Sequence, residues 1–222
     1  MQIQFFNSNQ LLIQFFLDYL KVYQKGREAL NIALSGGGTP LEIYKAVDEN
    51  QVLDYQKTKF WQVDERYINS DSSDSNQFQI QKCFKNPSFK DSFNPVCVNL
   101  GYPLAVLDYQ QKLSILRQKS VINIAILGFG LDGHFASIFT NPSEGSSDLF
   151  VATTASEIYP IPERLTMSSE MIESSEEIFV FLVGKSKKPV LQEFLFGQKT
   201  VSEFPAKYWL NHPKVRILAC LE

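Results

Sequence analysis

The segment ALNIALSGGGTPLE, at residues 29–42, contains the three parts of a strand–loop–helix unit. Residues 29–34 form an apolar run of strand length, and three glycines follow it after one serine. Thr39, Pro40 and Glu42 have the spacing of a helix start, with Thr39 as N-cap, Pro40 at the first helical position and Glu42 completing a capping box. The segment therefore predicts a buried strand, a glycine loop and a helix that begins after Thr39.

Similar strand-like runs recur along the rest of the chain. They lie at residues 60–63, 96–100, 121–127, 150–153, 178–183 and 215–221. Helical patterns separate most of them, as at residues 41–47, 104–116 and 189–196, and another covers residues 12–23 before Gly26. Strands that are buried on both faces and separated by crossover helices predict an α/β fold with a parallel-rich sheet between two helical layers. In such sheets, ligands bind beyond the carboxyl ends of the strands.

Length and composition are those of one globular domain. At roughly 150 residues per domain, 222 residues favour a single domain over 1–222. Hydrophobic residues make up 44% of the chain and charged residues 20%, which argues against both disorder and a membrane protein. There is no repeat, and the serine-rich stretches at 70–75 and 143–147 are the size of loops rather than linkers.

Charge, cysteine content and the N-terminal segment exclude several further classes. With 21 basic and 24 acidic side chains, the net charge of −3 provides no basic field for nucleic acid or an anionic membrane. Cys83, Cys97 and Cys220 are widely spaced, which predicts buried thiols in a reducing compartment. The apolar N-terminal stretch lacks a basic leader, and no 18 uncharged apolar residues run together, so we expect a cytoplasmic protein.

The glycine loop has the composition of an anion site. Gly36, Gly37 and Gly38 allow the backbone to approach a ligand closely, with free amides and the positive end of the helix turned toward it. A tight turn alone would need one glycine. No Gly-Lys-Ser/Thr follows, so the loop is not of the nucleoside-triphosphate type.

Polar residues also follow two other predicted strands. Asp64 and Arg66 come directly after residues 60–63 and could orient a polyol or stabilise developing negative charge, although such clusters are often only solvated. After residues 121–127 comes GFGLDGH, at 128–134. This segment matches the dinucleotide fingerprint, but it lies in mid-chain and lacks the acidic residue about twenty positions later that ribose binding requires. We therefore expect no NAD binding and interpret His134, beside Asp132, as a candidate general base.

Two later segments supply cations. Arg164 follows a proline-rich segment, and Lys187 follows the strand at 178–183 near a helix start. Although surface cations are usually solvated, these two could close a phosphate site opened by the glycine loop. We expect His212, before Pro213, to help close the final turn and to have no catalytic role.

Taken together, these motifs resemble the glucosamine-6-phosphate isomerase/6-phosphogluconolactonase family, and within it the 6-phosphogluconolactonases. The matching segments occur in the family's order over nearly the whole chain: residues 35–40, 61–66, 75–76, 128–139, 163–166, Gly184 with Lys187, and residues 205–213. The resemblance implies a Rossmann-like α/β fold and hydrolysis of a sugar-phosphate lactone without metal or cofactor, in the oxidative pentose phosphate pathway. It is compatible with a monomer or a homodimer.

By the same resemblance, His134 would be the general base. Asp132, its neighbour in the sequence, could orient the imidazole. Arg164 and Lys187 would bind the phosphate with the loop of Gly36, Gly37, Gly38 and Thr39. Asp64 and Arg66 would line the sugar.

Two other functions remain open from the sequence. A glucosamine-6-phosphate deaminase shares the glycine loop and the Asp-Gly-His core, but its Asp-Glu-Tyr and Asn-Glu-Pro motifs differ from residues 64–66 and 140–142 here. A non-catalytic sugar-phosphate binding protein could use the same loop. The chain also departs from the lactonases at Phe135, where threonine is common, and at Thr140, where proline is common.

Overall fold

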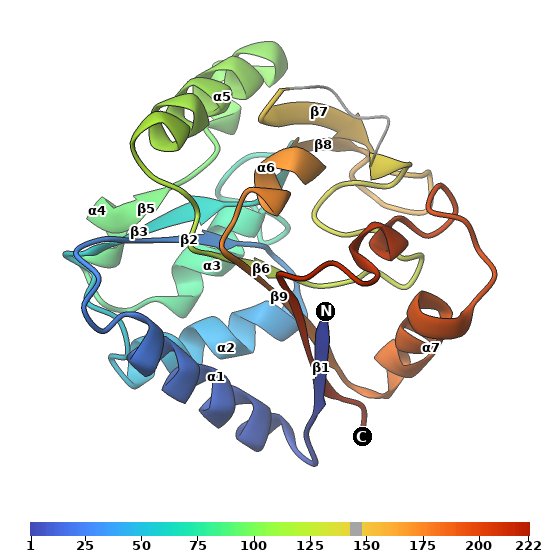
Figure 1. The fold of residues 1–222 in the computed structure, drawn as a ribbon. Helices are drawn as coiled ribbons and strands as arrows, with labels where there is room; N and C mark the ends of the chain where they lie inside the picture. Colours follow the sequence, from blue (N-terminus) through green and yellow to red (C-terminus); the bar gives the residue numbers. More distant parts are fainter. Residues whose placement is uncertain (143–147) are drawn as a thin grey trace.

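The computed structural model describes residues 1–142 and 148–222, so the serine-rich stretch at 143–147 lies outside the described residues. A seven-stranded sheet forms the centre of the molecule (Figure 1). Its strands are β1 (Gln2–Phe5), β2 (Leu30–Leu34), β3 (Thr58–Gln62), β5 (Phe93–Asn94), β6 (Ile124–Leu127), β9 (Glu177–Val183) and β10 (Val215–Cys220).

All neighbouring strands of this sheet are parallel, in the order β1-β10-β9-β6-β2-β3-β5. The chain moves outward from β2 to β3 and β5, and then returns to the other side of β2 with β6. The order of strands thus reverses between β2 and β6. Such a switch point leaves a crevice at the carboxyl ends of the two strands, where α/β proteins bind ligands.

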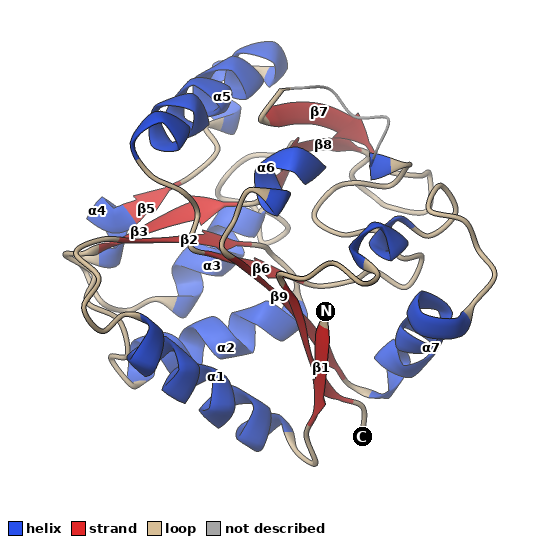
Figure 2. Cartoon of the chain, viewed as in Figure 1, coloured by secondary structure: helices blue, strands red, loops and turns tan. Residues whose placement is uncertain are grey.

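Helices cover both faces of the sheet (Figure 2). They are α1 (Asn9–Tyr23), α2 (Gly38–Glu49), α3 (Asn76–Cys83), α4 (Phe89–Ser92), α5 (Tyr102–Lys119), α6 (Ser169–Glu173) and α7 (Lys188–Phe196). Alternate side chains of β9 enter two different cores, with Val180 on the side of α5, α6 and α7 and Phe179 on the side of α1 to α4. The predicted three-layer α/β fold is therefore confirmed.

A second sheet of three antiparallel strands lies beside α5 (Figure 1). It has the order β4-β8-β7 and consists of β4 (Asp64–Arg66), β8 (Glu163–Met167) and β7 (Phe150–Thr154). The prediction that residues 150–153 form a strand buried on both faces was wrong, because β7 belongs to this small sheet and alternates between buried and more exposed residues. β4 and β8 begin or end with charged residues, so apolar patterning did not reveal them.

The strand predicted at residues 96–100 was also wrong. β5 ends at Asn94, and residues Val98–Leu100 form a 3₁₀ helix. Pro95 follows β5 and has no N–H to continue the ladder. The next amide, that of Val96, donates instead to Oε1 of Gln62 at 3.0 Å.

The capping box predicted at Thr39 does not form. Helix α2 already begins at Gly38, its N-cap is Gly37 with φ of 98°, and no side chain caps it. Glu42 accepts a hydrogen bond from Nδ2 of Asn9 in α1 at 2.8 Å. Because the first-turn amides of α2 keep no side-chain partner, this helix end is better suited to an external anion than the sequence predicted.

Two further sequence predictions concern the cysteines and membrane-spanning segments. All three cysteines are free thiols, and Cys83 and Cys220 are buried as predicted, whereas Cys97 is only half-buried. Over residues 1–142 and 148–222, no helix is both long enough and apolar enough to cross a bilayer.

Candidate active site

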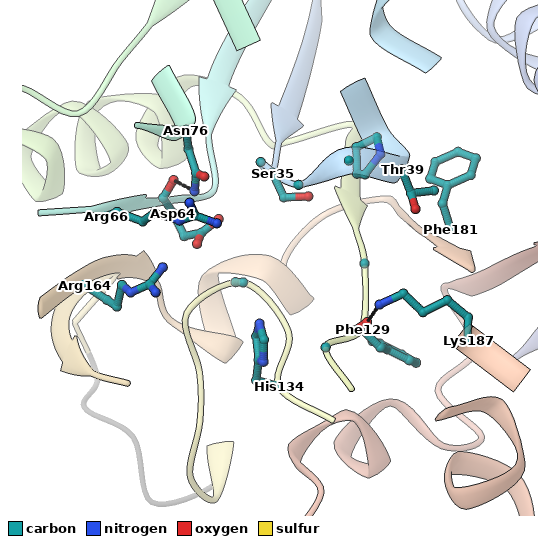
Figure 3. Close-up of a pocket in the computed structure, with 17 residues that line it drawn as sticks. Ser35, Thr39, Asp64, Arg66, Asn76, Phe129, His134, Arg164, Phe181 and Lys187 are labelled. Atoms are coloured by element: carbon teal, nitrogen blue, oxygen red, sulfur yellow. Dashed lines mark hydrogen bonds between the residues drawn. The ribbon is translucent and has the colours of Figure 1, made fainter. Parts of the chain in front are cut away.

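A pocket of about 230 Å³ opens at the carboxyl ends of β2 and β6, which is the switch point of the sheet (Figure 3). Segments from both sheets form its walls. The lining residues are Ser35, Gly36, Gly37, Gly38, Thr39, Pro40, Asp64, Arg66, Asn76, Gly128, Phe129, Gly130, His134, Ala136, Arg164, Phe181 and Lys187. Given a water's share of roughly 30 Å³ in the liquid, this space suits one small molecule.

The glycine loop forms one wall of the pocket together with the uncapped start of α2. The side chain of Asn76 leaves room only for glycine at position 36, since a Cβ there would lie 2.1 Å from Oδ1 of Asn76. Gly37 and Gly38 have no such neighbour within 4 Å. Their backbone is therefore open to a ligand.

His134 lies in the loop that follows β6 and points into the pocket between Arg164 and Lys187 (Figure 3). Its Nδ1 atom is 2.6 Å from Oδ1 of Asp132. The loop is folded tightly, with the Gly130 amide donating to the His134 carbonyl at 2.7 Å. A Cβ on Gly130 would lie 2.1 Å from Nδ1 of His134, so only glycine allows the imidazole to pack over this backbone.

Asp132 does not line the pocket but binds the outer side of the imidazole. Burial alone would raise the pKa of its carboxyl, but hydrogen bonds from His134 and Tyr159 outweigh burial and hold that pKa well below its ordinary value. Asp132 is therefore an ionised acceptor at neutral pH, suited to hold a proton on Nδ1 of His134.

Asp64 is a buried carboxylate at the pocket wall, with 5% of its surface exposed. Ser137 donates a hydrogen bond from Oγ to Oδ2 of Asp64 at 2.6 Å. Burial raises the pKa of Asp64, while the Ser137 hydroxyl and the charge of Arg164 act in the opposite direction. The side chain of Asn76 is fixed beside it by a bond from Nδ2 to the Asp64 carbonyl at 3.0 Å.

Arg66 and Arg164 are cross-strand partners in the small sheet. Like charges directly opposite each other are unfavourable in a sheet. Desolvation and the charge of Arg66 both lower the pKa of Arg164. Nε of Arg66 is buried without a hydrogen-bond partner in the described chain, and Nε of Arg164 donates to the Ile161 carbonyl at 2.8 Å. The pair therefore forms a cationic wall that an anionic ligand would relieve.

Lys187 supplies a third cation from the opposite side of the pocket (Figure 3). It lies in the 3₁₀ turn before α7, and its Nζ donates to the Phe129 carbonyl at 2.6 Å. Burial lowers the pKa of Lys187, and Asp132 opposes that shift. One N–H is thus used to hold the ammonium in place, while the others remain for a ligand.

Nine of the ten predicted site residues line this one pocket, and the tenth, Asp132, contacts His134. Sequence reasoning assigned no role to Ser137, which binds Asp64, or to Tyr159, which binds Asp132. Neither lies at a predicted strand end, and no spacing signal marks Tyr159. His212 lies outside the pocket, where its amide donates to the Trp209 carbonyl at 3.0 Å in the turn before β10, as expected. Among the described residues, no cluster of histidine, cysteine and acidic side chains has the form of a metal site.

Comparison with known proteins decides the family. The family model described as "Glucosamine-6-phosphate isomerases/6-phosphogluconolactonase" matches residues 8–217. The chain belongs to this family. A relative from Dictyostelium discoideum, named a probable 6-phosphogluconolactonase, is 36% identical over 189 residues, which cover 81% of this chain and 79% of the relative.

Solved structures in the family share the fold. The 6-phosphogluconolactonase of Thermotoga maritima superposes with a TM-score of 0.82 at 26% identity, covering 99% of this chain and 98% of that one. A monomeric glucosamine-6-phosphate deaminase gives the same TM-score of 0.82 at 22% identity, with 99% and 97% of the two chains covered. The fold is therefore common to both activities, and the side chains of the pocket must distinguish them.

Phe135 accounts for one departure from the family pattern. It is fully buried, and its ring packs edge-on against Trp209 with centroids 5.1 Å apart. The larger side chain thus fills a core position behind the loop and leaves the imidazole of His134 facing the pocket.

Proposed function

We propose that this protein hydrolyses 6-phospho-D-glucono-1,5-lactone to 6-phosphogluconate, with His134 as the general base. The observation that carries the proposal is that one pocket contains an imidazole, three cations and an uncapped helix start. The relatives named 6-phosphogluconolactonase support the choice of substrate.

The phosphate would bind in the space between Arg164 and Lys187, which line the pocket with charged donors from opposite sides (Figure 3). The amides of the loop at Gly37 and Gly38 face the same space. Charge-assisted hydrogen bonds of this kind are the strong ones in anion binding. With the phosphate held there, the lactone ring would extend toward Asp64, Arg66 and His134.

The chemistry begins with water, which is a poor nucleophile for an ester. Nε2 of His134 would take a proton from the water as its oxygen bonds to the lactone carbonyl carbon. The tetrahedral intermediate then collapses, the bond between C1 and the ring oxygen breaks, and the imidazolium returns the proton to that oxygen. The products are the carboxylic acid and a free 5-hydroxyl, and His134 is neutral again.

The developing oxyanion needs a donor. The guanidinium of Arg66, which lines the pocket, would be one such donor, and the backbone amides of the glycine loops would be another. Asp64 lines the pocket and binds Ser137 through Oδ2, so its Oδ1 would accept a hydrogen bond from a hydroxyl of the sugar.

Deamination is the rival reaction in this family. The deaminase motif has a glutamate between Asn and Pro after the histidine segment, whereas Asn141 and Pro142 are adjacent here. Within the described chain, Asp64 is the one carboxylate among the pocket-lining residues. The acid that ring opening of an amino sugar would use is therefore missing from its expected position.

The test uses freshly prepared 6-phosphogluconolactone and follows acid release above the spontaneous rate at several enzyme concentrations. We expect the rate of acid release to be proportional to enzyme concentration and to fall sharply in His134→Ala. A parallel assay measures ammonia from glucosamine 6-phosphate, and we expect none. Ammonia release without acid release would show a deaminase, and binding of 6-phosphogluconate without any turnover would show a sugar-phosphate binding protein.

A further inference from the structure

Tyr159 lies in the segment between β7 and β8 and contacts both His134 and Asp132. Its hydroxyl donates to Oδ2 of Asp132 at 2.9 Å and lies 3.2 Å from Nδ1 of His134. With the 2.6 Å contact between His134 and Asp132, the three side chains form a closed triangle. Tyr159 does not line the pocket, so its hydroxyl acts on a ligand only through the other two.

The protons of this triangle can be assigned one by one. Burial, together with the hydrogen bond to Asp132, raises the pKa of Tyr159 to about 12, so the hydroxyl keeps its hydrogen at neutral pH. That single hydrogen goes to the ionised Asp132, which only accepts. The hydrogen between Asp132 and His134 must then belong to Nδ1, and in the neutral form of the ring this leaves Nε2 with a lone pair.

We propose that Tyr159 is a positioning residue, whose hydroxyl fixes Asp132 and thereby holds His134 in the Nδ1–H tautomer with Nε2 presented to the pocket. This rests on the proposed function, in which Nε2 receives the proton of the attacking water. Asp132 accepts two hydrogen bonds from His134, which lies in its own loop, and one from Tyr159. Among the described residues, Tyr159 is the one side chain outside that loop that binds it. Without the Tyr159 hydroxyl, the carboxylate of Asp132 would be held through Oδ1 alone, by the amide and the ring of His134, and would fix Nδ1 less firmly.

The ring of Tyr159 has a separate packing role. It meets the imidazole edge-on at 88° with centroids 5.5 Å apart, and it contacts Phe139 at 5.4 Å. The guanidinium of Arg164 lies 5.8 Å from the centre of the same ring. Phenylalanine would keep these ring contacts, so Tyr159→Phe removes the hydroxyl alone.

The molecule contains a matched control. Tyr208 donates to Oε2 of Glu173 at 2.7 Å, and Glu173 in turn contacts His212 at 3.1 Å. This second group lies outside the pocket. Tyr208→Phe therefore removes a tyrosine–carboxylate–histidine hydrogen bond of the same kind without touching the proposed site.

The test is a spectroscopic one, made practical by the presence of only two histidines. Protein labelled with ¹⁵N-histidine reports the tautomer of each imidazole by long-range ¹H–¹⁵N correlation. We expect His134 of the unchanged protein to show a protonated Nδ1 and a bare Nε2 once the ring is neutral, and Tyr159→Phe to shift the signals toward a mixture of tautomers. Tyr208→Phe should leave the His134 signals unchanged.

Turnover of the lactone gives the second readout. We expect Tyr159→Phe to lower kcat by about 5- to 30-fold, because only part of the worth of a hydrogen bond to a charged group acts on the tautomer, with KM within about twofold. Unchanged tautomer signals and unchanged kcat in Tyr159→Phe, alongside an inactive His134→Ala, would overturn the positioning role and leave the proposed function standing. If the unchanged protein hydrolyses no lactone, the proposed function fails, and the tautomer signals alone still decide the role of Tyr159.

Discussion

His134 and His212 each lie beside a carboxylate that also accepts a hydrogen bond from a tyrosine. The distances are similar, at 2.6 Å and 2.9 Å around Asp132 and 3.1 Å and 2.7 Å around Glu173. The two imidazole side chains are also similarly buried, at 21% and 15% exposed. The groups nevertheless differ in their surroundings, because His134 faces a cationic pocket at the switch point and His212 packs against Trp209 in the turn before β10.

The two histidines also differ in which ring nitrogen the carboxylate leaves free. The carboxylate of Asp132 takes Nδ1 of His134, so Nε2 remains for the pocket. In His212 it is Nε2 that contacts the carboxylate of Glu173, and Nδ1 is buried without a partner in the described chain. The role proposed for His134 therefore depends on more than a neighbouring carboxylate and tyrosine, because the place of the free nitrogen decides whether a substrate can reach it.

The largest expected effect comes from removing each imidazole in turn. His134→Ala should lower kcat for the lactone by about 10²- to 10⁴-fold, because water loses its general base. His212→Ala should keep kcat within about twofold. Initial rates corrected for spontaneous hydrolysis measure both, and a retained rate in His134→Ala would place the base elsewhere.

The second effect concerns the cationic side chain near each histidine. Arg164 lines the pocket, whereas Lys214 donates to the Glu173 carbonyl at 2.8 Å. Arg164→Ala should weaken binding of 6-phosphogluconate by about 1.5–3 kcal/mol, the worth of a charged hydrogen bond. Lys214→Ala should leave binding unchanged. Calorimetric titration measures both, and a loss confined to kcat would assign Arg164 to the chemistry instead of the phosphate.

The third effect concerns the two carboxylates. Asp132→Asn should lower kcat by roughly 10- to 100-fold, because an amide can donate to Nδ1 and favour the wrong tautomer. Glu173→Gln should leave kcat unchanged. Steady-state kinetics on both variants is the measurement. An equal loss in the two variants would mean that both act through stability alone, and thermal unfolding would show it.

The smallest effect is on stability and depends on pH. The hydrogen bond from Tyr208 is the main cause that lowers the pKa of Glu173 from its ordinary 4.5. A lowered carboxyl pKa stabilises the folded state above pH 4.5, and that contribution disappears as the pH falls through the folded value. Glu173 is partly exposed, so Tyr208→Phe should cost only a few tenths of a kcal/mol near pH 7 and less at pH 3. Urea unfolding at both pH values checks this, and a cost that grew in acid would contradict it.

Five strands of the central sheet could be predicted from the sequence because they are apolar and largely buried, whereas β1, which is mostly exposed, and β5, which has two residues, could not. Residues 178–183 read as an uninterrupted apolar run, and β9 covers Glu177–Val183. The small sheet could not be predicted in this way. Strands such as Asp64–Arg66 are short and charged, and their pairing with β8 depends on tertiary contacts.

The candidate site could be predicted to the extent that its residues follow parallel strands. His134, Asp64 and the glycine loop were found because strand ends meet at one edge of the sheet. The start of α2 was placed wrongly because Thr39 has the right residue type for a cap, but Gly37 with its positive φ ends the loop two residues earlier. The role of Tyr159 depends on a contact 27 residues from Asp132, which no local pattern encodes.

Titration of ¹⁵N-histidine-labelled protein with 6-phosphogluconate most directly tests whether the base and the cations act on one ligand. We expect the His134 signals to move in proportion to saturation while those of His212 stay in place. In Arg164→Ala the same change should need a higher ligand concentration. A saturating ligand that leaves His134 unmoved, or that moves His212 instead, would show that the phosphate site and the imidazole do not share a substrate.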